Sequence, residues 1–105
     1  MIRHIVVLTF RSDATAAERA AVSDSLAALP AVIPEIRSYS FGEDLGLTGQ
    51  EGLGVVPNAS YGIVADFETV ADYARYRDHP AHQAAVRDRI RPILEARAVV
   101  QVDLP

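Results

Sequence analysis

The chain of 105 residues contains no cysteine and no lysine. Without cysteine it cannot form disulfides, use a thiolate nucleophile or bind a metal through sulfur. Without lysine it cannot form the Schiff base of lysine enzymes, because that chemistry needs a side-chain amine. All ten basic residues are arginine, and half of the chain is hydrophobic, as is ordinary for a globular protein. The length predicts a single domain over residues 1–105.

A basic surface and long hydrophobic runs are missing as well. The net charge is −4 and no basic block occurs, which argues against a nucleic-acid binder. No apolar run approaches the roughly 20 residues that cross a bilayer. The opening "MIRHIVVLTF" is too short for a signal peptide and is interrupted by Arg3 and His4. We therefore expect a cytoplasmic protein that has neither nucleic acid nor membrane as a partner.

Two stretches carry the signals of amphipathic helices. Thr15 and Glu18 have the spacing of a capping box, in which each side chain satisfies a free backbone amide of the first turn. Pro30 is expected to end the helix that begins there. Thr69 and Asp72 form a similar pair ahead of the second helical stretch. The first helix is therefore predicted over 15–30, and helical structure is predicted again over 68–96.

Four short runs rich in β-branched and aromatic residues are typical of strands. A long glycine-rich connection, residues 42–59, separates the second run from the third. Connections of this length often act as lids or mobile segments in a compact domain. The strands are predicted over 2–11, 35–41, 61–67 and 97–104.

The order of these elements is β-α-β-β-α-β, which predicts an α+β, ferredoxin-like fold. Such a fold has a four-stranded antiparallel sheet with its helices on one face. In the first strand His4, Val6 and Leu8 share one face, and Ile5 and Val7 share the other. A strand that is apolar on both faces is normally covered on both. Because the helices cover only one, the pattern predicts a homodimer in which a second copy of the sheet covers the other.

The stretch "RDHPAHQAAVRDRI" contains two of the three histidines. Proline is favoured at the first position of a helix, so Pro80 predicts His79 as the N-cap and His82 as the third helical residue. Burial and the positive end of the helix dipole both lower the pKa of His82, as a general base at pH 7 requires. The alternative is a structural His82 that only donates a hydrogen bond to a backbone carbonyl. Arg87 and Arg91 are expected on the opposite side of the helix, in water.

His4 is expected to face the same space as His82. A histidine in the middle of a strand must be hydrogen-bonded or line a cavity, since burying it unpaired costs about 1–3 kcal/mol. Tyr76 could add a hydroxyl from the preceding turns, although an ordinary core or surface tyrosine is equally compatible with its position. His79 and His82 lack an acidic companion at helical spacing, so we expect no metal site and no cofactor.

Four segments that cover nearly the whole chain carry a family resemblance: "IRHIVVLTF", "LPAVIPEI", "ADFETVADYARYRDHPAHQAAV" and "AVVQV". Together they resemble the stress-responsive dimeric α/β-barrel (Dabb) family. The most specific part is "HPAH", preceded by "DY" and by a strand that ends in Asp-Phe. The resemblance implies a ferredoxin-like protomer whose sheet packs face to face against a second copy, giving a dimeric α/β barrel.

Some members of this family are similar to cofactor-free cyclases, which fold a polyketide chain between the helices and the sheet. The resemblance implies that His82 is the base, with Tyr76 and His4 beside it. Gln101 stands where cyclase-like members carry an aspartate that orients the base, and Leu26 stands where they carry a tyrosine. Glutamine can hydrogen-bond an imidazole but cannot stabilise an imidazolium as a carboxylate does. The side chains expected around a small apolar ligand are Val6, Leu8, Leu26, Ile63, Tyr73, His79, Val86 and Gln101.

Two functions are compatible with these residues. In the first, a cofactor-independent enzyme acts on a small apolar carbonyl compound: His82 removes an α-proton, and Tyr76 and His4 hold the enolate oxygen, as in an aldol-type cyclisation. In the second, a non-catalytic homodimeric module binds a small ligand or acts in a stress response, and His82 is structural. A cofactor-free oxygenase is a third and weaker alternative. Gln101 and Leu26 shift the balance towards the second function or towards another activity.

Overall fold

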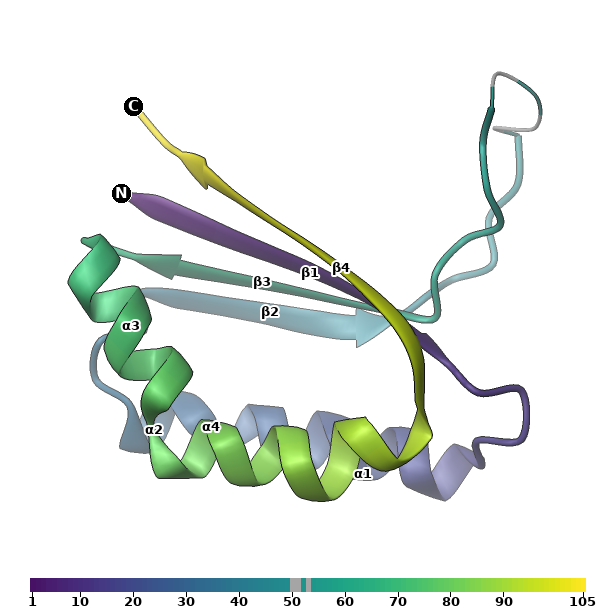
Figure 1. Cartoon of the computed structure of the whole chain (residues 1–105), viewed down its shortest axis with the longest axis horizontal. Helices are drawn as coiled ribbons and strands as arrows, with labels where there is room; N and C mark the ends of the chain where they lie inside the picture. Colours follow the sequence, from purple (N-terminus) through teal and green to yellow (C-terminus); the bar gives the residue numbers. More distant parts are fainter. Residues whose placement is uncertain (50–51, 53) are drawn as a thin grey trace.

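A computed structural model describes residues 1–49, 52 and 54–105 of the chain. Figure 1 shows a four-stranded antiparallel sheet with every helix on one of its faces. The strands run in the order β2-β3-β1-β4, which is the predicted α+β, ferredoxin-like arrangement. In chain order the elements are β1 (Ile2–Phe10), α1 (Ala16–Ala27), α2 (Leu29–Val32), β2 (Ser38–Glu43), β3 (Tyr61–Phe67), α3 (Val70–Asp78), α4 (Pro80–Ala85), a π-helical turn (Val86–Ile90), a 3-10 turn (Arg91–Ile93) and β4 (Leu94–Asp103).

The predicted start of the first helix is confirmed, but its predicted end is wrong. The Thr15 hydroxyl accepts a hydrogen bond from the Glu18 amide, and the Glu18 carboxylate accepts one from the Thr15 amide. The α1 helix ends at Ala27, and Pro30 lies in the first turn of α2. Proline is tolerated there because the first amides of a helix have no partner within it. Pro30 therefore begins a second short helix and does not end the helical region.

Two strand boundaries also differ from the prediction. The β2 strand begins at Ser38 and continues to Glu43, so the segment from 42 gives its first two residues to the sheet. The β4 strand begins at Leu94, and the residues 94–96 that were expected to be helical belong to it. The 3-10 turn around Pro92 ends the helical path just before that point, because proline cannot donate the next helical hydrogen bond.

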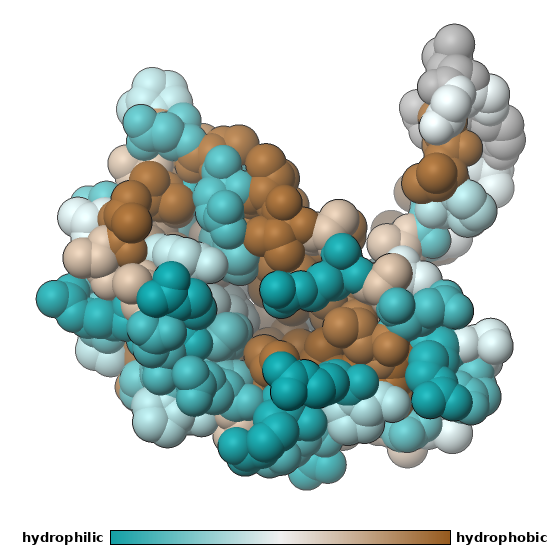
Figure 2. All heavy atoms as spheres, viewed as in Figure 1, coloured by the Kyte–Doolittle hydropathy of each residue, from teal (hydrophilic) through white to brown (hydrophobic). Residues whose placement is uncertain are grey.

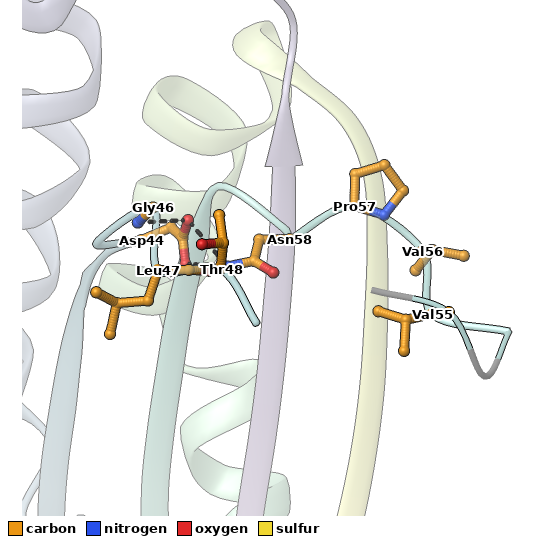
Figure 3. Close-up of a pocket in the computed structure, with 9 residues that line it drawn as sticks. Asp44, Gly46, Leu47, Thr48, Val55, Val56, Pro57 and Asn58 are labelled. Atoms are coloured by element: carbon orange, nitrogen blue, oxygen red, sulfur yellow. Dashed lines mark hydrogen bonds between the residues drawn. The ribbon is translucent and has the colours of Figure 1, made fainter. Parts of the chain in front are cut away.

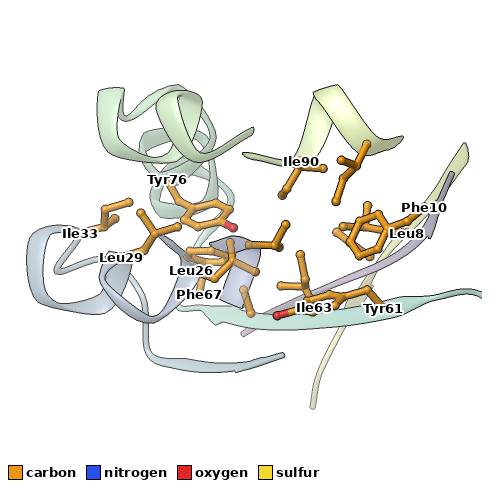
Figure 4. Packing of buried hydrophobic residues seen from close by; sticks show 14 residues of the cluster. Leu8, Phe10, Leu26, Leu29, Ile33, Tyr61, Ile63, Phe67, Tyr76 and Ile90 are labelled. Atoms are coloured by element: carbon orange, nitrogen blue, oxygen red, sulfur yellow. The ribbon is translucent and has the colours of Figure 1, made fainter. Parts of the chain in front are cut away.

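The hydrophobic core fills the space between the sheet and the helices. Figure 4 shows its side chains reaching from the strands towards the helices. Phe67 of β3 and Val22 of α1 are completely buried, and Leu26 is almost so. Because alternate residues of a strand face alternate sides, β1 contributes Val6, Leu8 and Phe10 to this core. The same alternation places His4 on the helix-covered face.

The other face of the sheet is apolar along β1 and β4. Among the described residues it carries no helix (Figure 1). Val7 of β1 is 40% exposed, and Val100 and Val102 of β4 are 51% and 38% exposed. Val7 pairs with Ala98 and Ile5 with Val100, so these side chains form one continuous surface across β1 and β4. The open face is thus the apolar second face that the sequence predicted.

Asp66 is the one buried carboxylate in the described part of the chain, and it predicts a stability change at low pH. Its oxygens accept hydrogen bonds from Arg3 at 2.8 and 3.0 Å and from Ser38 at 2.7 Å. The Arg3 hydrogen bond, against the opposing effect of burial, lowers the pKa of Asp66 to about 2. A carboxylate with a lowered pKa stabilises the fold above its unfolded pKa, near 4, and loses this contribution as the pH falls towards 2.

Asp66→Asn should therefore lower the free energy of unfolding at pH 7. At pH 2.5 the difference in free energy of unfolding between the wild type and the variant should be smaller. Urea unfolding at both pH values, at equal protein concentration, measures this. Asp78→Asn is a matched control, because Asp78 has a similar two-point contact with Arg77 but is exposed. Equal destabilisation of Asp66→Asn at both pH values would contradict the role given to the ionised carboxylate.

Candidate active site

A cavity of about 450 Å³ lies between the helix-covered face of the sheet and the helices. Figure 2 shows the molecule hollowed between the sheet and the helices, with hydrophobic residues around the hollow and hydrophilic residues at its rim. His4 of β1, Tyr76 of α3 and His82 of α4 all line this cavity. The three predicted reactive side chains, far apart in the sequence, thus face one space. Among the predicted ligand-contacting residues, those that also line it are Val6, Leu8, Leu26, Ile63, Tyr73 and Val86.

His82 is held in one orientation by the start of α4. The helix begins at Pro80, and Nδ1 of the N-cap His79 accepts a hydrogen bond of 3.0 Å from the Ala81 amide, as predicted. Nδ1 of His82 lies 3.1 Å from the carbonyl oxygen of Arg77. Because a carbonyl only accepts, this Nδ1 carries the proton, and the neutral ring keeps its lone pair on Nε2. No protein partner for that Nε2 occurs in the described ranges, so it is an acceptor without a donor.

His4 is held in the opposite tautomer. It is 8% exposed and sits opposite Gln101 in the β1–β4 register. The Gln101 side-chain nitrogen Nε2 lies 2.9 Å from Nδ1 of His4. Because an amide nitrogen only donates, Nδ1 of His4 accepts, and its Nε2 carries the proton. One histidine of the cavity therefore offers a lone pair and the other offers an N–H.

Both imidazoles are kept neutral by their surroundings. Burial is the largest cause of the lowered pKa of His4, followed by the repulsion that a protonated His82 would exert and by the charge of Arg97. Burial also lowers the pKa of His82, and Arg97 and His79 lower it further, while the hydrogen bond to the Arg77 carbonyl opposes them. A neutral His82 at pH 7 is the state in which it can accept a proton.

Tyr76 lies between the two histidines. Its ring centre is 4.2 Å from that of His82 and 6.3 Å from that of His4. Burial raises the pKa of Tyr76 to about 12, so its hydroxyl is protonated at neutral pH. Tyr39 of β2, which the sequence did not indicate, contacts this hydroxyl at 2.8 Å. When Tyr39 donates in that pair, Tyr76 keeps its own proton for another acceptor.

Three side chains lie elsewhere than expected. His79 does not line the cavity, because its ring is occupied in capping α4. Gln101 does not line it either and acts only through His4. Arg91, expected in water opposite the apolar stripe, lines the cavity. The reason is the π-helical turn: the Arg91 amide bonds to the carbonyl of Val86, five residues back, and the extra residue rotates Arg91 towards the sheet.

Arg97 and Val99 also line the cavity but were not recognised in the sequence. They alternate with Gln101 along β4, so the two-residue period of a strand would have placed them on the face of His4. No comparable signal was present for Arg91, because nothing in the composition of 86–90 announces a π-helical turn. Tyr39 could have been found from its pairing with Ala65 on the helix-covered face of the sheet.

The described residues of the loop between β2 and β3 do not line this cavity. Figure 1 shows the loop leaving the sheet on the side opposite the helices. It encloses a hollow of its own, of about 440 Å³, around Asp44 and Asn58 (Figure 3). Asp44 accepts a hydrogen bond of 2.9 Å from the amide of Gly46, whose φ of +72° favours glycine. Residues 50, 51 and 53 of the expected lid segment 42–59 lie outside the described part.

Among residues 1–49, 52 and 54–105, no three histidine, cysteine or acidic side chains gather as a set of metal ligands. Within the same ranges, no helix has the length and hydrophobicity to cross a membrane.

Comparison with solved structures identifies close structural relatives, whereas no curated protein matches the chain. A dimeric ferredoxin-like protein of unknown function from Thermobifida fusca is 37% identical, with a TM-score of 0.84 over 98% of this chain and 90% of the other. A Dabb family protein with a ferredoxin-like fold from Mesorhizobium loti is 26% identical, with a TM-score of 0.74 over 99% and 97%. A hydroxynitrile lyase from Passiflora edulis has the same fold at 20% identity, with a TM-score of 0.77 over 99% and 93%.

The match to a family model agrees with these structures. The model describes a stress-responsive A/B barrel domain, Dabb, and it matches residues 2–104. The chain is a member of the Dabb family.

Proposed function

We propose that this Dabb protein is a cofactor-independent enzyme that removes an α-proton from a small, largely apolar carbonyl compound. The observation that carries the proposal is the pair of opposite histidine tautomers in one cavity. His82 presents a bare Nε2 and His4 a protonated Nε2, each fixed by the hydrogen bond at its other nitrogen. A base and a hydrogen-bond donor that face one space are what enolisation requires.

The steps follow from these roles. Nε2 of His82 takes the α-proton, and the electrons of the C–H bond move into the carbonyl to form an enolate. The Nε2–H of His4 and the hydroxyl of Tyr76 donate hydrogen bonds to the enolate oxygen. In an aldol-type cyclisation the enolate carbon attacks a second carbonyl of the same molecule, and the His82 imidazolium returns its proton to the new alkoxide. Proton and charge balance without a cofactor.

A second candidate function is a non-catalytic module that binds a small ligand in the same cavity. One observation favours it: within the described residues no carboxylate contacts either histidine, and the imidazole that Gln101 contacts is that of His4. Among the described groups, the Arg77 carbonyl alone would thus stabilise an imidazolium formed on His82. In this alternative the hydrogen bond from His82 to the Arg77 carbonyl only orders the start of α4. The protein then does not catalyse exchange of the α-protons of a ketone.

We also propose that the chain forms a homodimer through the open face of its sheet. The exposed valines of β1 and β4 form a continuous apolar surface there, and the loop between β2 and β3 rises on the same side (Figure 1). Large exposed apolar patches mark sites of interaction with proteins, membranes or ligands, and a second copy of the same face is the apolar partner that supports this proposal. Two of the structural relatives are described as dimeric ferredoxin-like proteins, which agrees with such an assembly.

Proton exchange at a ketone tests the enzymatic proposal without knowledge of the natural substrate. We expect the wild-type protein to accelerate deuterium incorporation next to the carbonyl of 2-octanone or 7-oxooctanoate in D₂O, followed by proton NMR. With the uncharged 2-octanone, the rate should fall on the acid side with a midpoint below pH 6.5, because burial lowers the pKa of His82 from its ordinary value of 6.5. A rate equal to that of buffer for both ketones, or a midpoint above 6.5 with 2-octanone, would contradict the role of His82.

A further inference from the structure

Two arginines at the mouth of the cavity form no ion pair with any described residue. Arg91 and Arg97 line the cavity itself and also an adjoining hollow of about 330 Å³ that opens beside His82. Neither has a carboxylate partner within the part of the chain that the structure describes, whereas seven of the ten arginines do. These two guanidinium groups thus carry charge that no protein group neutralises.

The absence of acidic neighbours is specific to this place. No aspartate or glutamate is found among the described residues that line either hollow. The chain as a whole is acidic, with a net charge of −4, so an uncompensated positive mouth does not follow from its composition. Arg77 also lines the cavity, but it pairs with Asp78 and lies 5.9 Å from the centre of the Tyr73 ring.

Local structure brings the two free arginines together from different elements. The alternation of β4 directs Arg97 to the helix-covered face, opposite Leu8 of β1. The π-helical turn 86–90 rotates Arg91 towards the same opening. Such turns inside helices are frequent at functional sites, where they re-aim a side chain.

We propose that Arg91 and Arg97 bind the carboxylate of an amphipathic ligand whose apolar body enters the cavity. The inference deepens the proposed function, on which it rests for the carbonyl group of the ligand. Guanidinium groups match a carboxylate with two parallel hydrogen bonds, and an anion relieves the repulsion between the two cations. Behind them Val6, Leu8 and Val86 offer an apolar lining, and about 450 Å³ accommodates a molecule of small size.

A carboxylate bound at Arg97 should also change the pKa of the two cavity histidines. The charge of Arg97 lowers the pKa of both His4 and His82. A carboxylate on Arg97 neutralises that charge, so the pKa of both histidines should rise when the ligand binds. A neutral ligand of the same shape leaves the charge of Arg97 in place and lacks this effect.

A matched pair of ligands tests the inference on the whole protein. 7-Oxooctanoate and 2-octanone have the same chain length and the same methyl ketone, and only the first carries a carboxylate. By calorimetry 7-oxooctanoate should bind at least about 10-fold more tightly, since charge-assisted hydrogen bonds are roughly twice as strong as neutral ones. Arg91→Gln combined with Arg97→Gln should remove this preference by weakening 7-oxooctanoate binding to about the affinity for 2-octanone. Arg89→Gln is the control, because Arg89 likewise has no ion pair with a described residue but lies outside this cavity.

The outcomes separate this inference from the proposed function. Equal affinity of the wild type for the two ligands, or a preference that survives the double substitution, overturns the anion site. Failure of both ligands to bind overturns it as well. If 7-oxooctanoate binds as expected and neither ketone exchanges its α-protons, the anion site stands and the enzymatic proposal fails. Because Arg91 and Arg97 are both exposed, we expect the double variant to fold. The comparison of the two ligands on the wild-type protein does not depend on that variant.

Discussion

Replacing His82 by glutamine should reduce catalysed α-proton exchange by about 10²- to 10⁴-fold, the contribution of a well-placed general base. Glutamine has no nitrogen lone pair that accepts a proton at neutral pH, although its amide can still donate to the Arg77 carbonyl. The hydrogen bond that orders the start of α4 is thus largely kept, while the base is lost. The rate of deuterium incorporation into 2-octanone and 7-oxooctanoate measures the effect.

The matched control is His79→Gln, three residues earlier on the same helix start. It removes the ring that caps α4 through the Ala81 amide, which should lower the free energy of unfolding by about 1 kcal/mol. Exchange should remain close to the wild-type rate, because His79 does not line the cavity. Exchange at the wild-type rate in a folded His82→Gln protein would contradict the role of His82 as the base, because another group would then remove the α-proton.

If the proposed homodimer forms through the open face, Val100→Asp should convert it into a monomer. Val100 lies in the middle of β4 on the open face and is 51% exposed. In a symmetric interface the substitution appears twice, and each buried carboxylate without a partner costs several kcal/mol. Light scattering after size-exclusion chromatography should give about twice the chain mass of 11.4 kDa for the wild type and the single-chain mass for the variant.

Val70→Asp makes the same chemical change away from the open face. Val70 is 67% exposed at the first turn of α3, where an aspartate is favoured by the helix dipole. This variant should keep the mass of the wild type. A wild-type protein that is monomeric at micromolar concentration, or a Val100→Asp protein that remains dimeric, would contradict the proposed interface.

Local patterns were sufficient to predict most of the fold. The Thr15–Glu18 capping box, the alternation of β1 and the β-α-β-β-α-β order each reflect interactions between near neighbours, and the structure contains all three. Boundaries were less certain where a residue is compatible with two structures. Pro30 can follow one helix or begin the next, and only the contact of α2 with the rest of the molecule decides between them.

The candidate site was predictable for side chains whose direction is set by a regular helix or strand. It was not predictable for a side chain whose direction is set by a local irregularity. The position of His82 followed from Pro80, and the position of His4 followed from the period of a strand. Arg91 was misplaced because the π-helical turn shifts every later side chain by one position. The tautomers of the two histidines were not predicted, since they depend on which group each Nδ1 contacts: the Arg77 carbonyl five residues before His82, and the Gln101 amide on the strand beside His4.

The tautomers of the two cavity histidines give the most direct test of the proposed acid–base pair. Long-range ¹H–¹⁵N NMR of the imidazole rings at pH 7.5 distinguishes a protonated Nδ1 from a protonated Nε2. The account predicts neutral rings at both positions, with the proton on Nδ1 in His82 and on Nε2 in His4. A proton on Nε2 of His82, or a charged His82 ring at this pH, would contradict the account, because the cavity would then contain no base.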